Sequence, residues 1–193
     1  MTSPPQKPPD EELLVRIQEG DRSAFETLFR SYYEELCAFV DAKIGASDYA
    51  DDIVQNVFLS LWRRRQELEI RSTLRAYLYG AARNESITYR RRRRERSQTE
   101  DQTKRVTERI RDWASLSPAE TLERDELKAV IQESIDALPE RRREVYVLSR
   151  QHGLTYKEIA IVMDISPKTV DTQMVAALKF LRKRLQARSS RAL

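Results

Sequence analysis

The sequence predicts an all-α protein made of two small helical domains joined by a flexible linker. Charged residues make up 34% of the 193 residues, aromatic residues make up 8%, and there are only four glycines, a composition that favours helices over sheet. Apolar residues recur at helical spacing over residues 10–95 and again over 117–188. Residues 96–116 are polar and weakly patterned, so we expect a linker there. Residues 1–9 carry four prolines and are expected to form a disordered tail, and residues 189–193 form a second tail.

Four helices are expected in the first domain, and capping signals set the ends of the first two. Asp10 can cap the first helix, and Gly20 stops it. Ser23 and Glu26 have the spacing of a capping box at the start of the second helix, and Gly45 ends it. The expected helices therefore span approximately residues 10–20, 23–45, 47–65 and 72–94.

The second domain is expected to begin with another capping box, formed by Ser117 and Glu120. Apolar residues at helical spacing predict a helix that runs to Leu138. Pro139 then opens the next helix, because proline is tolerated at the first helical position, and Gly153 ends it.

The last part of this domain has the pattern of two helices separated by a short turn. Thr155 and Glu158 have capping-box spacing at the start of the first helix. Residues 164–165 form the expected turn, after which Ser166 is a good N-cap and Pro167 a good first helical residue. This is the layout of a helix-turn-helix, whose second helix enters the major groove of DNA with its first turns. A plain αα-hairpin with a solvated basic face is the alternative interpretation.

The second of these helices divides its residues between two faces. The apolar face is expected to be buried and consists of Val170, Met174, Ala177, Leu178, Leu181 and Leu185. The opposite face and the basic residues beyond it are expected to contact duplex DNA through Ser166, Pro167, Lys168, Thr169, Asp171, Thr172, Val175, Lys179 and Arg182.

No constellation of catalytic residues emerges from the sequence. The chain has one cysteine, Cys37, and one histidine, His152, which are too few for a zinc site built on nitrogen and sulfur ligands. Cys37 lies in an apolar helical pattern and is expected to be a buried free thiol. Asp51 and Asp52 carry metal-binding groups, but a carboxylate pair at a helix start more often stabilises the helix dipole. We therefore expect no enzyme, no cofactor, no metal and no small-molecule substrate.

The chain also lacks the apolar segments that direct proteins to membranes. No apolar run reaches the roughly 18 residues that a membrane-spanning helix needs. The first residues, MTSPPQKPPD, lack the apolar core of a signal peptide. With the single cysteine, these features predict a cytoplasmic protein without membrane insertion.

Five consecutive arginines, Arg90–Arg94, end the fourth expected helix. Their side chains point to every side of the helix, so their mutual repulsion costs stability unless an anion relieves it. A polyanion is therefore the expected partner. A nuclear-localisation tract and a merely solvated basic helix end are the alternatives.

Several segments carry a resemblance to a known family. They read FETLFRSYYEELCAFV, DYADDIVQNVFLSLWRRR, STLRAYLYGAARNESITYRRRRR and LPERRREVYVLSRQHGLTYKEIAIVMDISPKTV, followed by ALKFLRKRL. In this order they resemble an extracytoplasmic-function (group 4) sigma factor of bacterial RNA polymerase, a branch of the sigma-70 family. The similarity spans residues 10–188. The chain looks most similar to the iron-starvation and outer-membrane-uptake branch, and the sequence leaves that sub-assignment open.

The resemblance implies a role for each domain. Residues 10–95 resemble sigma region 2, which binds core RNA polymerase and the −10 element of promoters. Residues 117–188 resemble region 4, which reads the −35 element and touches the polymerase β flap. The implied function is promoter recognition and DNA melting in transcription initiation. Core polymerase and promoter DNA are therefore expected partners, and an anti-sigma factor is a further expected partner.

The resemblance also assigns the outer face of the third expected helix to polymerase. The matching residues would dock on the coiled coil of the polymerase β′ clamp, and they are Asp51, Asp52, Gln55, Asn56 and Leu59. The family usually has Gln-Glu where this chain has Gln55-Asn56, and the lost carboxylate puts one polar contact with the clamp in doubt.

The fourth expected helix would open the −10 element. Asn84 matches the position that helps to hold a flipped-out base, and the loop 67–71 would form another wall of that pocket. Capture of an extruded base offsets roughly a few kcal/mol of unstacking, and the strand backbone needs cations. The expected contacts with the −10 element are Arg83, Asn84, Ser86, Thr88, Tyr89, Arg90, Arg91, Arg92, Arg93 and Arg94.

Two other functions are compatible with parts of the sequence. A stand-alone helix-turn-helix regulator would bind duplex DNA by itself, normally as a dimer on a palindrome, whereas a sigma factor would need core polymerase. A helical adaptor whose arginine run binds RNA would leave the second domain unexplained.

Overall fold

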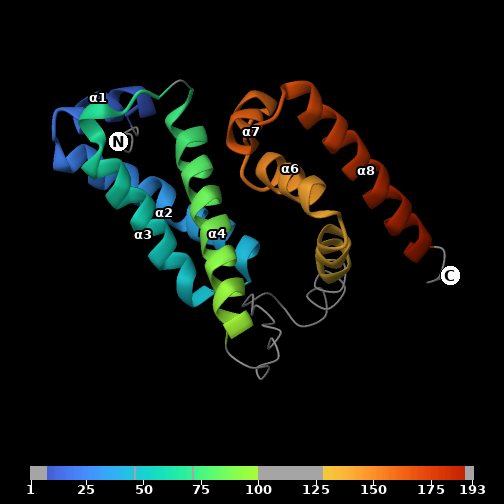
Figure 1. Cartoon of the computed structure of the whole chain (residues 1–193). Coiled ribbons are helices and arrows are strands. Elements are labelled where there is room, and N and C mark those ends of the chain that lie inside the picture. Colours follow the sequence, from blue (N-terminus) through green and yellow to red (C-terminus); the bar gives the residue numbers. More distant parts are fainter. Residues whose placement is uncertain (1–7, 46, 71, 100–127, 190–193) are drawn as a thin grey trace, which may run out of the picture. The chain divides into compact units, whose positions relative to one another are not determined.

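The computed structural model describes residues 8–45, 47–70, 72–99 and 128–189, and every regular element within these ranges is helical, as predicted (Figure 1). These residues divide into two compact units. The first unit contains the described residues up to 99 together with 157–165, and the second contains the remainder. The limits predicted for the two domains stay predictions, since the segment between them lies outside the described ranges.

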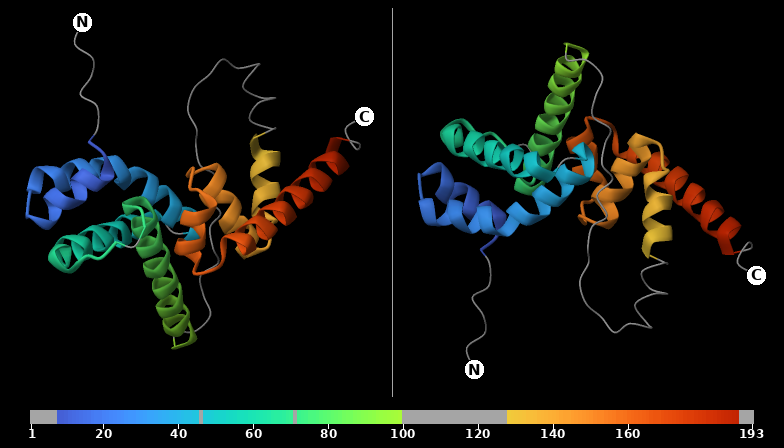
Figure 2. Two further views of the ribbon diagram at one scale, coloured as in Figure 1. Left: turned by 90° about the horizontal axis from the view of Figure 1, so that it is seen from above. Right: turned by 90° about the horizontal axis from the view of Figure 1, so that it is seen from below.

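The N-terminal part of the first unit is built from helices that pack side by side. They are α1 (Asp10–Gln18), α2 (Arg22–Ile44), α3 (Ser47–Arg63), the short 3-10 turn η1 (Arg65–Glu67) and α4 (Leu74–Thr99). The long helix α2 packs against α1, α3 and α4, and α3 also packs against α4 (Figure 2). Helix α4 continues five residues past its expected end at 94 into the predicted linker, because residues 95–99 include no proline or glycine that would end it.

The core of this unit comes from the apolar faces that the sequence predicted. Side chains that are at most 1% exposed come from each of the four α-helices and include Leu13, Ile17, Leu28, Leu36, Phe58, Leu61, Leu78 and Tyr79. Phe29 of α2 packs against Phe58 of α3 with ring centroids 4.8 Å apart. Phe39 of α2 packs against Tyr79 of α4 at 5.3 Å. Such aromatic pairs bury large areas with a defined geometry and so determine which face each helix turns inward.

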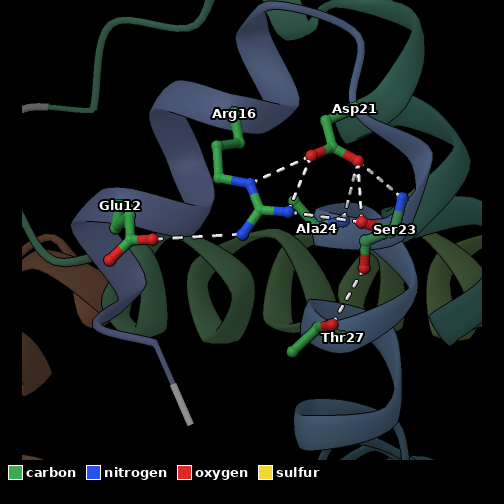
Figure 3. Close-up of polar contacts among 6 residues, drawn as sticks. All are labelled: Glu12, Arg16, Asp21, Ser23, Ala24 and Thr27. Atoms are coloured by element: carbon green, nitrogen blue, oxygen red, sulfur yellow. Dashed lines mark hydrogen bonds and ion pairs between the residues drawn. The ribbon is translucent and has the colours of Figure 1, made fainter.

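The start of α2 differs from the predicted capping box. Asp21 is the N-cap, and its Oδ1 accepts hydrogen bonds from the backbone N–H groups of Ser23 at 2.8 Å and Ala24 at 3.2 Å (Figure 3). The Ser23 hydroxyl donates to the same oxygen, and Glu26 forms an ion pair with Arg30 instead of reaching back. The prediction was wrong because an aspartate two residues earlier caps the helix at least as well as a serine.

Asp21 also ties α1 to α2. Arg16 of α1 donates from Nε and Nη2 to Asp21 Oδ2, at 2.9 and 2.8 Å (Figure 3). These bonds are the largest of several effects that lower the pKa of Asp21 to about 2. Between the two helices Gly20 has a φ of 91°, a conformation that glycine adopts without steric cost.

The predicted N-cap of α1 was also wrong. Asp10 is the first residue inside the helix, Pro9 occupies the N-cap position, and Pro9 has no side chain able to cap. The Asp10 carboxylate instead accepts a hydrogen bond from the hydroxyl of Tyr32 in α2. Burial raises the pKa of Tyr32, and the neighbouring Asp10 charge raises it further. Asp10 therefore joins two helices rather than capping one.

The second unit contains the helical residues 128–136, α6 (Glu140–Arg150) and α8 (Pro167–Ser189). Helix α6 packs against α8. The buried residues between these elements are Ile135, Leu138, Ala177 and Leu181, flanked by the partly buried Tyr146, Val147 and Phe180. Arg184 of α8 forms an ion pair of 3.3 Å with Glu133. The predicted helix start and capping box at 117–120 lie outside the described residues.

Helix α7 (Tyr156–Met163) ends in a tight turn. Asp164 has a left-handed φ of 53°. Its N–H donates to the carbonyl of Ile161 at 3.3 Å, and the N–H of Ile165 donates to the carbonyl of Ala160 at 2.9 Å. This pair of bonds is a Schellman motif, and aspartate is one of the few residues besides glycine that enter the left-handed region readily.

The start of α8 and its apolar face follow the prediction with two exceptions. Ser166 Oγ accepts a hydrogen bond from the N–H of Thr169 at 3.1 Å, and Pro167 is the first helical residue. The apolar face is buried except at Leu178, which is 42% exposed, and at Leu185, which is half-buried. Leu178 lies four residues after buried Met174 but three after exposed Val175, so it stands at the border of the two faces.

We predict that Asp21→Ala lowers the melting temperature by several degrees, whereas Asp21→Asn retains most of the stability because an asparagine still caps α2. The pKa of Asp21 is lower in the folded protein than its ordinary value of 3.8. Its ionised carboxylate therefore stabilises the fold above about pH 4, and this contribution disappears as the pH falls to about 2. Thermal melts of the three proteins between pH 7 and pH 2 test this. A difference between wild type and Asp21→Asn that is unchanged down to pH 2 would contradict it.

Candidate functional site

The outer α3 surface consists of the five residues that the sequence assigned to it: Asp51, Asp52, Gln55, Asn56 and Leu59. All five are exposed, and Leu59 is 47% exposed. On the opposite side of the same helix Ile53, Val54 and Val57 are at most 6% exposed. The buried stripe therefore leaves a polar face with one apolar side chain, Leu59, at its C-terminal end.

One carboxylate on this surface is held by α2. Asp51 Oδ1 accepts hydrogen bonds from the Tyr33 hydroxyl at 3.2 Å and from Cys37 Sγ at 3.3 Å. Gln55 hydrogen-bonds the same Tyr33 hydroxyl, so Tyr33 links two residues of the surface. Sequence reasoning missed Tyr33 because it lies on another helix, far away in the chain. Its half-buried ring stacks on Phe29 with centroids 4.6 Å apart.

Cys37 is half-buried, not fully buried as predicted. Burial raises the pKa of its thiol to about 12, and the hydrogen bond and charge of Asp51 add to that rise. The thiol therefore stays protonated near neutral pH and serves as a donor to Asp51.

The α4 surface contains the residues predicted to contact a DNA strand, with one correction. Asn84 and the four residues Arg91–Arg94 are exposed, and Arg83, Thr88, Tyr89 and Arg90 are half-buried. Ser86 is completely buried, and its hydroxyl donates to the carbonyl of Ala82 at 2.7 Å. Ser86 has no access to a ligand in this arrangement, so we remove it from the α4 surface.

The arginine run occupies the last turns of α4. Arg91 Nε lies 3.9 Å from Glu95, one helical turn away. An exposed ion pair of this length contributes little, so a phosphate could replace it at small cost. Tyr89 packs against Tyr49, from the first turn of α3, with ring centroids 5.0 Å apart. The tyrosine pair packs α4 against α3 just before the arginine run begins.

The loop expected to form another wall of the pocket is only partly described. Leu68 is 9% exposed, and its carbonyl accepts a hydrogen bond from Gln18 Nε2 at 3.0 Å. The loop is thereby attached to α1. Residue 71, its last member, lies outside the described ranges.

The α8 surface consists of the predicted contacts with duplex DNA. Eight of these nine residues have exposed side chains at the start and along one side of α8, namely Ser166, Pro167, Lys168, Asp171, Thr172, Val175, Lys179 and Arg182. The ninth residue, Thr169, is half-buried next to the Ser166 cap. The buried residues Val170, Met174 and Ala177 lie on the other side of the helix.

Neither a metal site nor a membrane span is found among the residues that the structure describes. No three acidic, histidine or cysteine side chains gather there closely enough to hold a metal ion. No helix in the same ranges is long and apolar enough to cross a membrane.

Comparison with known families assigns both parts of the chain. The family model for sigma-70 region 2 matches residues 28–96, and the model for sigma-70 region 4 matches residues 128–181. The chain belongs to the sigma-70 family. It is a sigma factor for transcription initiation, and the region 2 match rules out the stand-alone helix-turn-helix regulator. Sigma factors are not an enzyme class.

Curated relatives place the sigma factor in the extracytoplasmic-function branch, as its sequence predicted. The RNA polymerase sigma-H factor of Pseudomonas aeruginosa is 28% identical over 181 residues. The sigma-E factor of Escherichia coli K12, an extracytoplasmic-function sigma factor, is 26% identical over the same length. Each comparison covers 92% of this chain and 94% of the relative.

Solved structures share the fold. CnrH, solved in complex with the cytosolic domain of CnrY, has a TM-score of 0.64 and 22% identity and covers 92% of this sigma factor and 97% of its own chain. The sigma factor RpoE of Bartonella quintana, solved with the anti-sigma factor NepR, has a TM-score of 0.66 and 22% identity, and covers 84% and 96% respectively.

We predict that Cys37 reacts slowly with thiol reagents in the folded protein. With a pKa of about 12, only about one thiol in ten thousand is ionised at pH 8. Asp51→Asn should speed the reaction, because it removes a negative charge that opposes thiolate formation. The rate with a chromogenic disulfide, before and after unfolding in denaturant, measures both effects. Equal rates in the wild type and the variant would show that Asp51 does not act on the thiol.

Proposed function

We propose a division of labour for this sigma factor. The outer α3 surface binds core RNA polymerase, the α4 surface captures the unpaired strand of the −10 element, and the α8 surface reads the −35 element as duplex. The observation that carries the proposal is the separation of faces. On α3 and α8 the residues assigned to a partner are exposed, apart from the half-buried Thr169, while most of the apolar stripe of the same helix is buried.

The outer α3 surface has the composition of a protein-docking site. Its polar side chains are followed on α3 by Leu59, an exposed apolar group available for burial by a partner. A combination of apolar and polar contacts is usual in protein interfaces. Tyr33 and Cys37 hold Asp51 through hydrogen bonds, so less side-chain freedom is lost when a partner binds.

The α4 surface combines the groups that strand capture needs. The exposed amide of Asn84 has both donors and an acceptor for the edge of a flipped base. The exposed arginines that begin two turns further on attract the phosphate backbone. Both are carried by one continuous helix, so the distance between base pocket and cations is fixed before DNA arrives.

The α8 surface suits the major groove. Lys168 can donate to guanine or phosphate, Asp171 can accept from the amino group of cytosine, and Val175 can contact a thymine methyl group. All three are exposed at the end of the helix that enters the groove. Lys179 and Arg182 follow on the same helix and are available to phosphates.

The proposed partners of the sigma factor follow from the roles assigned to its three surfaces. Polymerase supplies the catalysis, so the sigma factor itself has no catalytic activity and works in the cytoplasm, where polymerase works. An anti-sigma factor is a further proposed partner. It is supported by the two solved structures of the same fold that contain a bound protein partner, and by Val175 and Leu178, which are 59% and 42% exposed on α8.

We predict that the double variant Asp52→Arg with Gln55→Ala no longer co-purifies with core polymerase. Both side chains are exposed, so the far-UV circular dichroism spectrum should be unchanged, while the docking face gains a misplaced charge. Pull-down with purified core polymerase measures the effect.

Glu11→Arg is the matched control, because it makes the same change of charge at an exposed position of α1 outside the proposed surface. Co-purification of the double variant at wild-type affinity would show that polymerase binds elsewhere. Equal loss in the control would attribute the effect to net charge.

We predict that substitutions in the two DNA surfaces impair different steps of promoter recognition. Asn84→Ala removes hydrogen bonds that form only after a base is flipped, so open-complex formation should fall about tenfold while closed-complex binding persists. Asp171→Ala should change the preferred −35 sequence, by about 1–3 kcal/mol of discrimination, and leave melting intact on a matching promoter. Gel shift of the complex with core polymerase measures binding, and permanganate footprinting measures melting.

Each of these variants serves as the control for the other. Equal loss of binding and melting in Asn84→Ala would reduce Asn84 to a residue needed for packing. An unchanged −35 preference in Asp171→Ala would place base reading on other residues of the α8 surface.

A further inference from the structure

One exposed apolar side chain on α4 has no role in the proposed function so far. Ile87 is 43% exposed and is the one large apolar side chain exposed on the part of α4 whose side chains are described. Single exposed apolar residues are common on protein surfaces. The position of Ile87 is what distinguishes it, since it lies between the base-holding amide and the cations of the α4 surface.

Helix geometry places Ile87 within the α4 surface. Residues three and four apart are neighbours on a helix, so Ile87 adjoins Arg83 and Asn84 on one side and Arg90 and Arg91 on the other. The neighbouring hydroxyl that the sequence suggested for DNA contact, that of Ser86, is buried and bonded to its own helix. The strand therefore meets an isoleucine where sequence reasoning placed a serine.

The chemistry of DNA limits what an isoleucine can recognise. Among the groups on base edges only the C5 methyl group of thymine is apolar. Along the helix axis Ile87 lies about 4.5 Å from Asn84, three residues at 1.5 Å each. Successive nucleotides of one strand are about 3.4 Å apart. Ile87 is thus within reach of the nucleotide next to the one that Asn84 holds.

The side chain of Ile87 also has a restricted conformation before such a contact forms. A β-branched residue in a helix has essentially one χ1 rotamer, so Ile87 loses little freedom when a base packs on it. The flanking arginines bind the phosphates of the strand, which carry no sequence information. Discrimination between bases therefore depends on the apolar contact.

We propose that Ile87 is a specificity-determining residue that selects thymine at the nucleotide adjacent to the base held by Asn84. This inference rests on the proposed strand capture by the α4 surface. It adds a preference for the methyl group at one position of the −10 element.

The test compares thymine with deoxyuridine, which lacks only the methyl group. On a promoter mapped with this sigma factor and core polymerase, each position of the non-template −10 strand carries in turn thymine or deoxyuridine. The rate of open-complex formation is then measured for the wild type, Ile87→Ala and Val15→Ala. Alanine is a good helix former, so Ile87→Ala should fold. Val15, 55% exposed on α1, is the matched control for loss of an exposed apolar side chain.

At one position the wild type and Val15→Ala should open the deoxyuridine promoter about three- to fivefold more slowly than the thymine promoter. Ile87→Ala should open both at the same reduced rate. The proposal is overturned if no position is sensitive to the methyl group in the wild type, or if Ile87→Ala keeps the same sensitivity. If Asn84→Ala opens promoters at the wild-type rate, the strand-capture function itself fails, and the preference assigned to Ile87 fails with it.

Discussion

The arrangement of every surface in this sigma factor depends on the burial of one apolar stripe per helix. A helix as polar as α3 or α8 is not stable alone in water and persists because one side is removed from solvent. Once Ile53, Val54 and Val57 are buried, the rotation of α3 about its axis is fixed, and its outward residues are decided as well. A substitution in the buried stripe would therefore alter the outer α3 surface without touching it.

The helices and their buried faces were predictable because they follow from residue spacing within a short stretch of chain. The ends were less predictable, since neighbouring residues compete for the same N–H groups. Asp21 displaced Ser23 as the cap of α2 because its carboxylate serves two backbone donors and also Arg16. Asp10 does not cap α1 as expected, and its carboxylate contacts Tyr32 instead. Tyr32 lies on another helix, so no local sequence pattern predicts this contact.

The candidate site likewise combines features that were predictable from the sequence with features that were not. Exposure of the outer α3 surface could be derived from periodicity, but the link between Asp51 and Tyr33 could not, because the packing of α2 on α3 creates it. Ser86 and Ile87 show the limit of sequence-based prediction of exposure within a single helix. One residue of rotation, 100°, separates a buried hydroxyl from an exposed side chain. Residue chemistry favoured the serine as a DNA contact, but the packing of α4 buries the serine and exposes the isoleucine.

The continuation of α4 to Thr99 has a geometric consequence for the arginine run. Because Arg90–Arg94 lie on a regular helix, their side chains leave its axis in directions 100° apart and complete slightly more than one full circle. A single strand passing along one side of this rod can meet only two or three of them. The remaining guanidinium groups lie on other sides of the helix, so one strand cannot be neutralised by all five arginines at once.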